Sequence, residues 1–473
     1  MSRCAPLVVW PRPAGTPAVR RKWRAWLRPA AAALVLIVCA QGSAGERSDA
    51  ASADLTPAAA ALEPWSTESL AFRVAKVVAL DDQRTVLNDA VVLVKDGRIE
   101  KMGPASEVAI PPGYRTLEFR EHWLLPGIVE AHNHSAAGGM ADLNDMIYQT
   151  NPGLDTRSIP QPDNYYAKRA RAGGVTTCLV LPGSGTNISG MGTIVSTAGR
   201  NPDEMILRSP GSLKVAQSGN PEWYFGGNGR TFMNWNTRQT IEKARAYSRK
   251  WDAWEAARET DPHAAPPEFD PIWELLRPVF RHEIPVTNHT QMYQVLNETL
   301  DMFVRGFKLW TVTEHSSFDA WKVGPVVKQI EDLGVDGENG GAKGGLWTIQ
   351  GPRQYHYDRT CNRIVGNASG WWKHGVRNLG INTDAPVIPQ EQLTYQAAMA
   401  CWYGWLPYPA LLSITNVTAK SIGVYDRVGS LAPAKQADLT IWTGDPLDPR
   451  SACLMTVVKG RIVYDGTKGM RRF

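Results

Sequence analysis

The stretch LPGIVEAHNHSA (Leu125–Ala136) decides how the rest of the chain is interpreted. A Pro126-Gly127 break precedes an apolar run that ends in His132 and His134, with one residue between them. In a β-strand, residues i and i+2 point to the same face, so both imidazoles could bind one metal ion from a single strand. Two unrelated polar residues at a strand end would have the same spacing, and the rest of the chain must decide.

Both ends of the chain have sequence patterns typical of short β-strands. Between Leu70 and Phe119, segments with β-branched residues are separated by turns, and KDGR (95–98) is typical of a hairpin. The same pattern occurs near the C-terminus, where VVKGRIVYDG (457–466) is similar to LVKDGRIEKMG (93–103). We therefore expect one small β-sandwich domain formed from both chain ends.

Between these ends, from about Pro126 to Arg427, apolar strand patterns alternate with helical ones. The predicted strands are LPGIVEAHNHS, VTTCLVLPGS, GSLKVAQS, IPVTNHTQ, FKLWTVTEHSS, GGLWTIQGP and VRNLGINTDAP. Repeated βα units of this number and length predict an α/β fold built on a TIM-like (β/α)8 barrel.

Polar side chains with ligand chemistry follow several of these predicted strands. They are His132, His134, Lys214, His289, His315 and Asp384. The chain has nine histidines, and four of them come directly after a run of β-formers. Because active sites of such barrels lie at the carboxyl ends of the strands, we expect these side chains to converge. A lone histidine at a strand end is usually a hydrogen-bonded structural residue, and Asp384 before Ala-Pro could be a turn former or a helix N-cap.

The chemistry of this set favours a metal site. Imidazole and carboxylate suit zinc, and also manganese, iron or nickel. A catalytic metal lowers the pKa of a bound water towards about 7 and so supplies hydroxide at neutral pH. A nearby carboxylate can take the water's proton and pass it to a leaving nitrogen, and Asp384 is the candidate for this general base and acid role.

The net charge of the chain is set by its first 44 residues. The formal charge is +5, but residues 1–44 carry seven basic and no acidic residues, which leaves 44 basic against 46 acidic residues in the remainder. A nucleic-acid-binding function therefore has no support. RRKWRAWLRP, the apolar run Ala30–Ala40 and GSA ending at Ala44 have the order of a secretory signal peptide. The alternative is a membrane anchor at residues 30–40, although that run is short for a span.

These observations divide the chain into five parts. We expect a signal peptide (1–44), a disordered Ala-rich linker (45–65), a first β-sandwich part (66–125), the barrel (126–427) and a second β-sandwich part (428–473). The protein would be exported, periplasmic or secreted, with no stable membrane span after cleavage. Four scattered cysteines lie outside the leader, and their spacing excludes a cysteine zinc site.

Several of these motifs resemble the metal-dependent amidohydrolase superfamily, in particular its imidazolonepropionase-like branch. LPGIVEAHNHS is similar to the family's first-strand motif, with Glu130 where an aspartate is usual. AGGVTTCLVLPGSGTNISGMGTIV and SLKVAQSGNPEW look like the strand-2 and strand-4 regions of one subgroup. NTDAPVIPQEQLTYQAAMACWYG and DRVGSLAPAKQADLTIWTGDPLD resemble the strand-8 segment and the return to the sandwich. The likeness covers about residues 70–466 and is weakest from Asn228 to Pro285.

The resemblance implies a ligand set for one or two divalent ions, most simply zinc. Its members are His132, His134, Lys214, His289, His315 and Asp384. Lys214 would be a carboxylated lysine that bridges two metals; the alternative is a partly exposed or salt-bridged lysine. Glu130 lies outside the ligand set and is expected to orient rather than to bind.

The family reaction implied is hydrolysis of a small-molecule amide or cyclic amide at its carbon–nitrogen bond. His315 would also steady the developing oxyanion. Asn187, Arg353 and His356 lie on predicted barrel loops and are candidates for substrate binding. A deaminase on the same scaffold and a non-catalytic exported binding protein stay open as alternatives. The sequence leaves the substrate, the metal count and a homo-oligomeric state undecided.

Overall fold

The structure is a computed structural model that describes residues 68–138, 143, 145–224, 228–337 and 343–468. The predicted signal peptide and linker lie outside the described residues. All of the described residues belong to one compact unit. None of the helices in the described ranges is long and apolar enough to cross a membrane.

A seven-stranded sheet combines the two ends of the described chain. Its order is β17-β16-β15-β4-β1-β2-β3, so strands from the C-terminus continue the sheet that the N-terminal strands begin. The strands are β1 (Leu70–Val78), β2 (Val86–Lys95), β3 (Arg98–Pro104), β4 (Arg115–Pro126), β15 (Leu439–Trp442), β16 (Cys453–Val458) and β17 (Arg461–Asp465). The predicted joining of the two ends matches this sheet, while its description as a β-sandwich stays a prediction.

A second sheet of eight strands forms a nearly closed, TIM-like barrel. Its order is β14-β11-β10-β9-β8-β7-β6-β5. The strands are β5 (Ile128–Asn133), β6 (Val175–Val180), β7 (Ile188–Ser196), β8 (Ile206–Ala216), β9 (Val286–Thr290), β10 (Thr311–His315), β11 (Leu346–Gln350) and β14 (Leu379–Ile381). The first and last strands meet through a parallel bridge between Asn133 and Ala385, and His134 N donates to Ala385 O at 2.8 Å.

The barrel departs from eight βα repeats at β7. This strand pairs antiparallel with both β6 and β8, whereas the other neighbouring pairs are parallel. No strand was predicted for this segment from the sequence, and Asn187 just before it was placed on a loop. Two of its glycines are needed for packing: a Cβ at Gly190 would lie 2.5 Å from Leu154 O, and one at Gly192 would lie 2.6 Å from a methyl group of Leu181. The β6–β7 hairpin therefore replaces one crossover helix.

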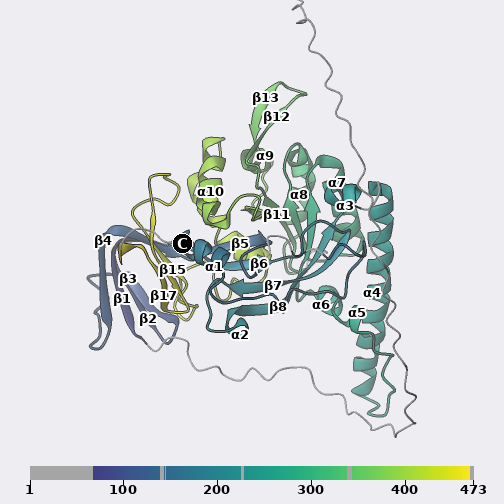
Figure 1. Cartoon of the computed structure of the whole chain (residues 1–473), viewed down its shortest axis with the longest axis horizontal. Helices are drawn as coiled ribbons and strands as arrows, with labels where there is room; N and C mark the ends of the chain where they lie inside the picture. The colour runs from purple at the N-terminus through teal and green to yellow at the C-terminus, as the bar shows by residue number, and fades with distance from the viewer. Residues whose placement is uncertain (1–67, 139–142, 144, 225–227, 338–342, 469–473) are drawn as a thin grey trace, which may run out of the picture. The chain divides into compact units, whose positions relative to one another are not determined.

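Helices connect the remaining strands around the barrel (Figure 1). The helices of at least five residues are α1 (Tyr165–Ala172), α3 (Asn220–Tyr224), α4 (Arg230–Arg258), α7 (Tyr293–Thr299), the π-helical η1 (Leu300–Gly306), α8 (Gly324–Glu331), α9 (Asn367–Lys373), α10 (Leu393–Trp402), α11 (Pro407–Leu412) and α12 (Asn416–Ser421). The shorter ones are α2 (Pro202–Met205), α5 (Pro271–Glu274), α6 (Arg277–Phe280), η2 (Ala320–Val323), η3 (Gln390–Gln392) and η4 (Gly466–Lys468).

Two insertions extend the barrel. The long α4 runs along one side of it, on the edge away from the seven-stranded sheet in Figure 1. Its inward positions, among them Ile241 and Ala244, pack with Leu276 in a separate apolar cluster. A hairpin of β12 (Tyr355–Asp358) and β13 (Arg363–Gly366) stands out beyond the ends of the barrel strands. This hairpin occupies what the sequence analysis took as a loop after β11.

Pro126-Gly127 joins the two sheets. β4 ends at Pro126 in the seven-stranded sheet, and β5 begins at Ile128 in the barrel. Gly127 N donates to Asp438 O at 2.8 Å, while a Cβ at Gly127 would lie 2.1 Å from Thr176 Oγ1. A glycine is therefore required where the chain passes from one sheet to the other, and the next strand delivers the histidine pair.

Candidate metal centre

The end of β5 brings two imidazoles against one carboxylate. His132 Nε2 and His134 Nε2 lie 3.2 Å apart. Asp384 Oδ1, which follows β14 at the other side of the barrel closure, lies 3.4 Å from His132 Nε2 and 3.2 Å from His134 Nε2. The three ligand atoms lie within 4.8 Å of one another, and both histidines are buried.

The second nitrogen of each ring shows which atoms face the centre. His134 Nδ1 lies 2.9 Å from Leu181 O, and a carbonyl oxygen only accepts, so the proton is on Nδ1. His132 Nδ1 lies 3.2 Å from Glu314 Oε2, which favours a proton on that nitrogen as well. Both Nε2 atoms then carry lone pairs that point at each other and at Asp384. Three acceptors at such short distances repel one another unless they share a cation.

His289 at the end of β9 and His315 at the end of β10 complete the histidine cluster. Their rings lie 4.4 Å apart, and the His315 ring lies 4.7 Å from that of His132. His315 Nδ1 donates to Gly351 O at 3.0 Å, and His289 Nδ1 lies 2.7 Å from Ser184 Oγ. Among the described residues, the Nε2 atoms of both rings are buried without a partner. Two more imidazole nitrogens are thus available to a ligand.

Glu130 fixes the chain on both sides of the barrel closure. Its buried carboxylate accepts His132 N at 3.2 Å, Thr383 N at 3.0 Å and Thr383 Oγ1 at 2.6 Å. One side chain therefore ties the histidine strand to the residue that precedes Asp384. Burial raises the pKa of Glu130 to about 8, although these hydrogen bonds act in the opposite direction. Its contacts are those of an orienting residue, as the sequence analysis expected.

Lys214 in β8 lies inside the same cluster. Its side chain is fully buried, and Nζ lies 3.1 Å from His132 Nε2. A partly exposed lysine is therefore ruled out, while the salt-bridged lysine that the sequence also allowed stays open. The position next to the histidine pair is compatible with a ligand role after carboxylation.

The shifted pKa values of the cluster favour protonation states that can bind a cation. Burial, followed by the charge of Lys214, holds the pKa of His132 well below its usual value. Burial also lowers the pKa of His289 well below the usual value and that of His315 to about 4. Burial alone would raise the pKa of Asp384, but neighbouring His315 and His134 lower it overall. Neutral imidazoles beside an ionised carboxylate are the protonation states in which these groups coordinate metal.

The donor set fits a divalent transition metal. It offers four imidazole nitrogens and a carboxylate oxygen, the ligand types of zinc, manganese, iron and nickel sites. Gly219 keeps one side open, since a Cβ there would lie 3.3 Å from His289 Nε2. His315 and Asp384 have φ of 66° and 52°, conformations that cost energy for residues other than glycine. Strain at two of the converging residues is typical of a functional site.

A cavity of about 290 Å³ opens beside the cluster. Its walls include His289, His315, Asp384, Asn220, Gln291, Ser317, Phe318, Gly351, Pro352, Arg353 and Val387. Arg353 lies over the Phe318 ring at 5.0 Å. The structure therefore brings one of the three predicted substrate-binding residues to the cavity, and that residue is a cation.

The other two predicted substrate-binding residues are engaged elsewhere. Asn187 is fully buried, and its Nδ2 donates to Ala216 O at 2.7 Å and to Thr237 Oγ1 at 3.1 Å. It joins β7 to β8 and α4 and does not line the cavity. His356 lies in the β12–β13 hairpin, where its Nδ1 is 3.0 Å from Asn367 Oδ1. Neither side chain belongs to the cavity wall in the described part of the chain.

Three residues that the sequence patterns did not indicate support the histidines: Glu314, Ser184 and Asn382. Glu314 Oε2 accepts Asn382 Nδ2 at 2.7 Å and lies beside His132 Nδ1. A glutamate in the otherwise apolar or hydroxyl-bearing strand TVTEH is a signal that could have been used, because a buried carboxylate needs a partner. Ser184 follows a strand in a glycine-rich stretch and gives no comparable signal.

Known proteins with similar sequences are hydrolases. The Amidohydrolase family model matches residues 367–465, which include Asp384 but not the histidine pair. The amidohydrolase tasK of Hapsidospora irregularis is 26% identical over 409 residues, which are 79% of this chain and 40% of that protein. The imidazolonepropionase of Maricaulis maris (strain MCS10) is 25% identical over 400 residues, which are 78% of this chain and 91% of that protein. The chain thus spans two fifths of the first relative and nearly all of the second.

A solved structure has the same architecture. The amidohydrolase from Thermotoga maritima MSB8 superposes with a TM-score of 0.71 at 25% sequence identity, covering 84% of this chain and all of that chain.

Proposed function

The chain belongs to the metal-dependent amidohydrolase superfamily, in its imidazolonepropionase-like branch, and from this premise we propose that it hydrolyses a cyclic or peptide-like amide at the carbon–nitrogen bond. One observation carries the proposal. His132 Nε2, His134 Nε2 and Asp384 Oδ1 converge within 3.4 Å of one another beside a cavity that Asp384 also lines. Acceptors in this arrangement fit a bound divalent cation next to a substrate-sized space.

We propose that His132, His134, His289, His315 and Asp384 hold the metal, with zinc as the first candidate. When bound, such an ion acidifies water and polarises a carbonyl group. Asp384 takes the proton of the attacking water and delivers it to the leaving nitrogen, as the new carbon–oxygen bond replaces the carbon–nitrogen bond. The lowered pKa of Asp384 keeps it ionised and able to accept that proton.

The structure favours His315 as a ligand over the oxyanion role that the sequence also allowed. Its Nδ1 proton is committed to Gly351 O, so Nε2 offers a lone pair. Donation to an oxyanion from Nε2 would need the protonated ring, and burial lowers the pKa of His315 to about 4. At neutral pH the ring can therefore bind a cation but cannot donate from Nε2.

Arg353 suggests an acidic substrate. Its guanidinium lies at the cavity wall over Phe318, where it would meet a carboxylate on the part of the substrate remote from the scissile bond. The cavity volume of about 290 Å³ suits a small ring with one such substituent. We therefore place small cyclic amides with a carboxylate first among the candidates.

A screen of amides and cyclic amides on metal-loaded protein tests this function. We expect turnover of at least one carboxylate-bearing cyclic amide, and Asp384→Asn should lower kcat by at least about a hundredfold while the protein stays folded. Folded protein that turns over a substrate at full rate without metal would refute the mechanism.

Two further activities are separated by the same screen. Release of ammonia from an aminated ring, with the ring intact, would identify a deaminase. A ligand that binds without turnover and with similar affinity in Asp384→Asn would identify a binding protein. The convergence of acceptors favours the hydrolase over a binding protein, because binding alone does not require them.

We also propose that the chain is exported and that residues 1–44 are removed. The basic, apolar and small-residue order of this leader supports the proposal, together with the acidic balance of the remainder. N-terminal sequencing of protein from the producing cells should give a first residue near Gly45. A chain that retains the apolar segment 30–40 would instead be anchored.

A further inference from the structure

We propose that a second pocket, on the other side of the barrel from the metal centre, binds a small molecule that joins a flat aromatic ring to a carboxylate. The pocket measures about 740 Å³. Leu379, the first residue of β14, lies in its wall, whereas Asp384 follows the carboxyl end of the same strand. The two sites therefore lie at opposite ends of β14 and have no lining residue in common.

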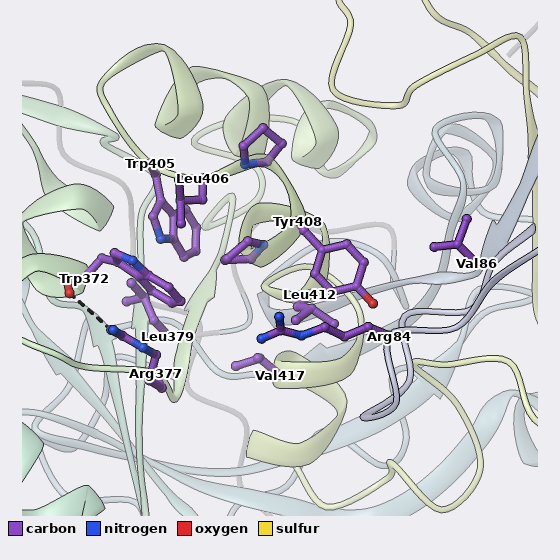
Figure 2. Close-up of a pocket in the computed structure, with 12 residues that line it drawn as sticks. Arg84, Val86, Trp372, Arg377, Leu379, Trp405, Leu406, Tyr408, Leu412 and Val417 are labelled. Carbon is purple, nitrogen blue, oxygen red and sulfur yellow. Dashed lines mark hydrogen bonds between the residues drawn. The ribbon is translucent and has the colours of Figure 1, made fainter.

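Aromatic side chains form the walls of this second pocket. Trp372 and Trp405 lie on one side and Tyr408 on the other, with Leu412 next to Tyr408 (Figure 2). Trp405 is 4% exposed, while Trp372 and Tyr408 are partly exposed. Facing aromatic surfaces bind a flat ring through stacking and edge contacts. The shape thus suits an aromatic body better than a strongly hydrated ion.

Arg377 gives the pocket its first cation. The guanidinium lies 3.7 Å from the Trp372 ring centroid, and Nη1 donates to Trp372 O at 3.1 Å and Val376 O at 3.0 Å (Figure 2). Both bonds leave from one nitrogen, so Nη2 and Nε keep their protons for another acceptor. Stacking and these two hydrogen bonds hold the Arg377 guanidinium in place. Less side-chain entropy is therefore lost when a carboxylate binds to it.

The carboxylate of Glu331, which is close to Arg377, accepts hydrogen bonds from the backbone and not from the guanidinium. Glu331 accepts Arg377 N at 2.9 Å and Asn378 N at 3.0 Å. Burial raises the pKa of Glu331 to about 7, so this group neutralises the guanidinium only in part at neutral pH. Among the described residues, no carboxylate lies within ion-pair distance of the Arg377 guanidinium.

Arg84 supplies a second cation across the pocket. Its guanidinium lies 5.9 Å from the Tyr408 ring centroid. The acidic residues of the same turn are engaged elsewhere: Asp81 accepts Thr85 N, and Asp82 is paired with Lys420. Two cations that lack carboxylate partners in the described chain disfavour a cationic ligand and favour an anion.

Titration calorimetry of the full-length, metal-loaded protein with 2-naphthoate tests the proposal. We expect saturable binding that weakens about tenfold or more in the double variant Arg84→Met, Arg377→Met, because each charge-assisted bond contributes strongly. The neutral analogue 2-naphthylmethanol should bind correspondingly weakly. Arg353→Met is the matched control, since it removes an arginine of the same kind from the metal-site cavity and should leave this binding unchanged.

A crystal soaked with 6-bromo-2-naphthoate locates the ligand directly. The anomalous bromine peak should lie between Trp372 and Tyr408. The proposal is overturned if the peak appears only beside Arg353, or if the double variant binds 2-naphthoate as tightly as the wild type. Sedimentation provides a further check: a dimer whose interface covers Trp405 and Tyr408 would also overturn it, because the occupant would then be a second copy of the chain.

Discussion

Glu314 Oε2 lies 3.2 Å from His132 Nδ1, and neither side chain reaches solvent. The same oxygen accepts Asn382 Nδ2 at 2.7 Å, which fixes its position beside the His132 ring. Burial raises the pKa of Glu314 well above its usual value. When the carboxyl group is protonated, the proton is carried by the second oxygen, Oε1. This arrangement holds the His132 ring with Nε2 towards the centre.

Glu314→Ala should therefore weaken metal binding by about 10- to 100-fold, as is typical when the support of a metal-binding histidine is lost. Metal affinity is measured by competition with a chromophoric chelator. Glu331→Gln is the matched control, because it alters a half-buried glutamate remote from His132 and should keep the affinity. Equal metal affinity in Glu314→Ala and wild type would show that the carboxylate does not support the ring.

Removing the metal should destabilise the protein. A ligand that binds only the folded state at a thousand times its Kd contributes about 4 kcal/mol, so chelation should lower Tm by several degrees, and added zinc should restore it. In His132→Asn the chelator should change Tm little. His263→Asn is the control, since this exposed loop histidine lies away from the cluster. If neither the chelator nor zinc changes the Tm of the wild type, the result would contradict a metal site.

The histidine cluster could be predicted because two simple patterns coincide. Period-2 spacing places His132 and His134 on one face of β5, and parallel barrel strands end at one edge, which brings in His289 and His315. These rules depend only on local β-propensity and on the direction of the strands. They apply equally to Asp384, which closes the barrel opposite β5.

Glu314 could not be found in this way, because its neighbour breaks the alternation on which the rule rests. His315 has φ of 66°, outside the β region, so adjacent residues no longer point strictly to opposite faces. Glu314 and His315 therefore both reach the His132 ring. The antiparallel β7 was missed for a related reason: Gly190 and Gly192 are chosen for close approach to Leu154 and Leu181, which are distant in sequence.

Lys214 should determine how many metal ions the site holds. A fully buried ammonium 3.1 Å from His132 Nε2 is unfavourable beside cations, whereas a carbamate formed with carbon dioxide would be an anionic ligand. We expect wild-type protein prepared with bicarbonate to bind two zinc equivalents and Lys214→Met to bind one. Atomic emission analysis of both proteins gives the ratio. The same number of equivalents in both would leave Lys214 outside the ligand set.

Glu331 should make stability depend on pH near neutrality. Burial raises its pKa from 4.5 to about 7 in the folded chain, so between these values the folded state binds a proton that the unfolded state lacks. The stabilisation from this group is complete below pH 4.5 and is lost as pH rises through about 7. The shift corresponds to at most about 3 kcal/mol.

Glu331→Gln removes this titration and keeps the size of the side chain. The free energy of unfolding of the variant, minus that of the wild type, should therefore increase between pH 5 and pH 8 by roughly 1–3 kcal/mol. Denaturant unfolding measures it, and taking the difference cancels the pH dependence of the metal site. The new amide faces Arg377 N, and any loss of stability from that contact is the same at every pH. It therefore changes the size of the difference in unfolding free energy but not its dependence on pH. Glu268→Gln, at an exposed position, should show no such tilt, and a flat difference for Glu331→Gln would mean that Glu331 ionises alike in both states.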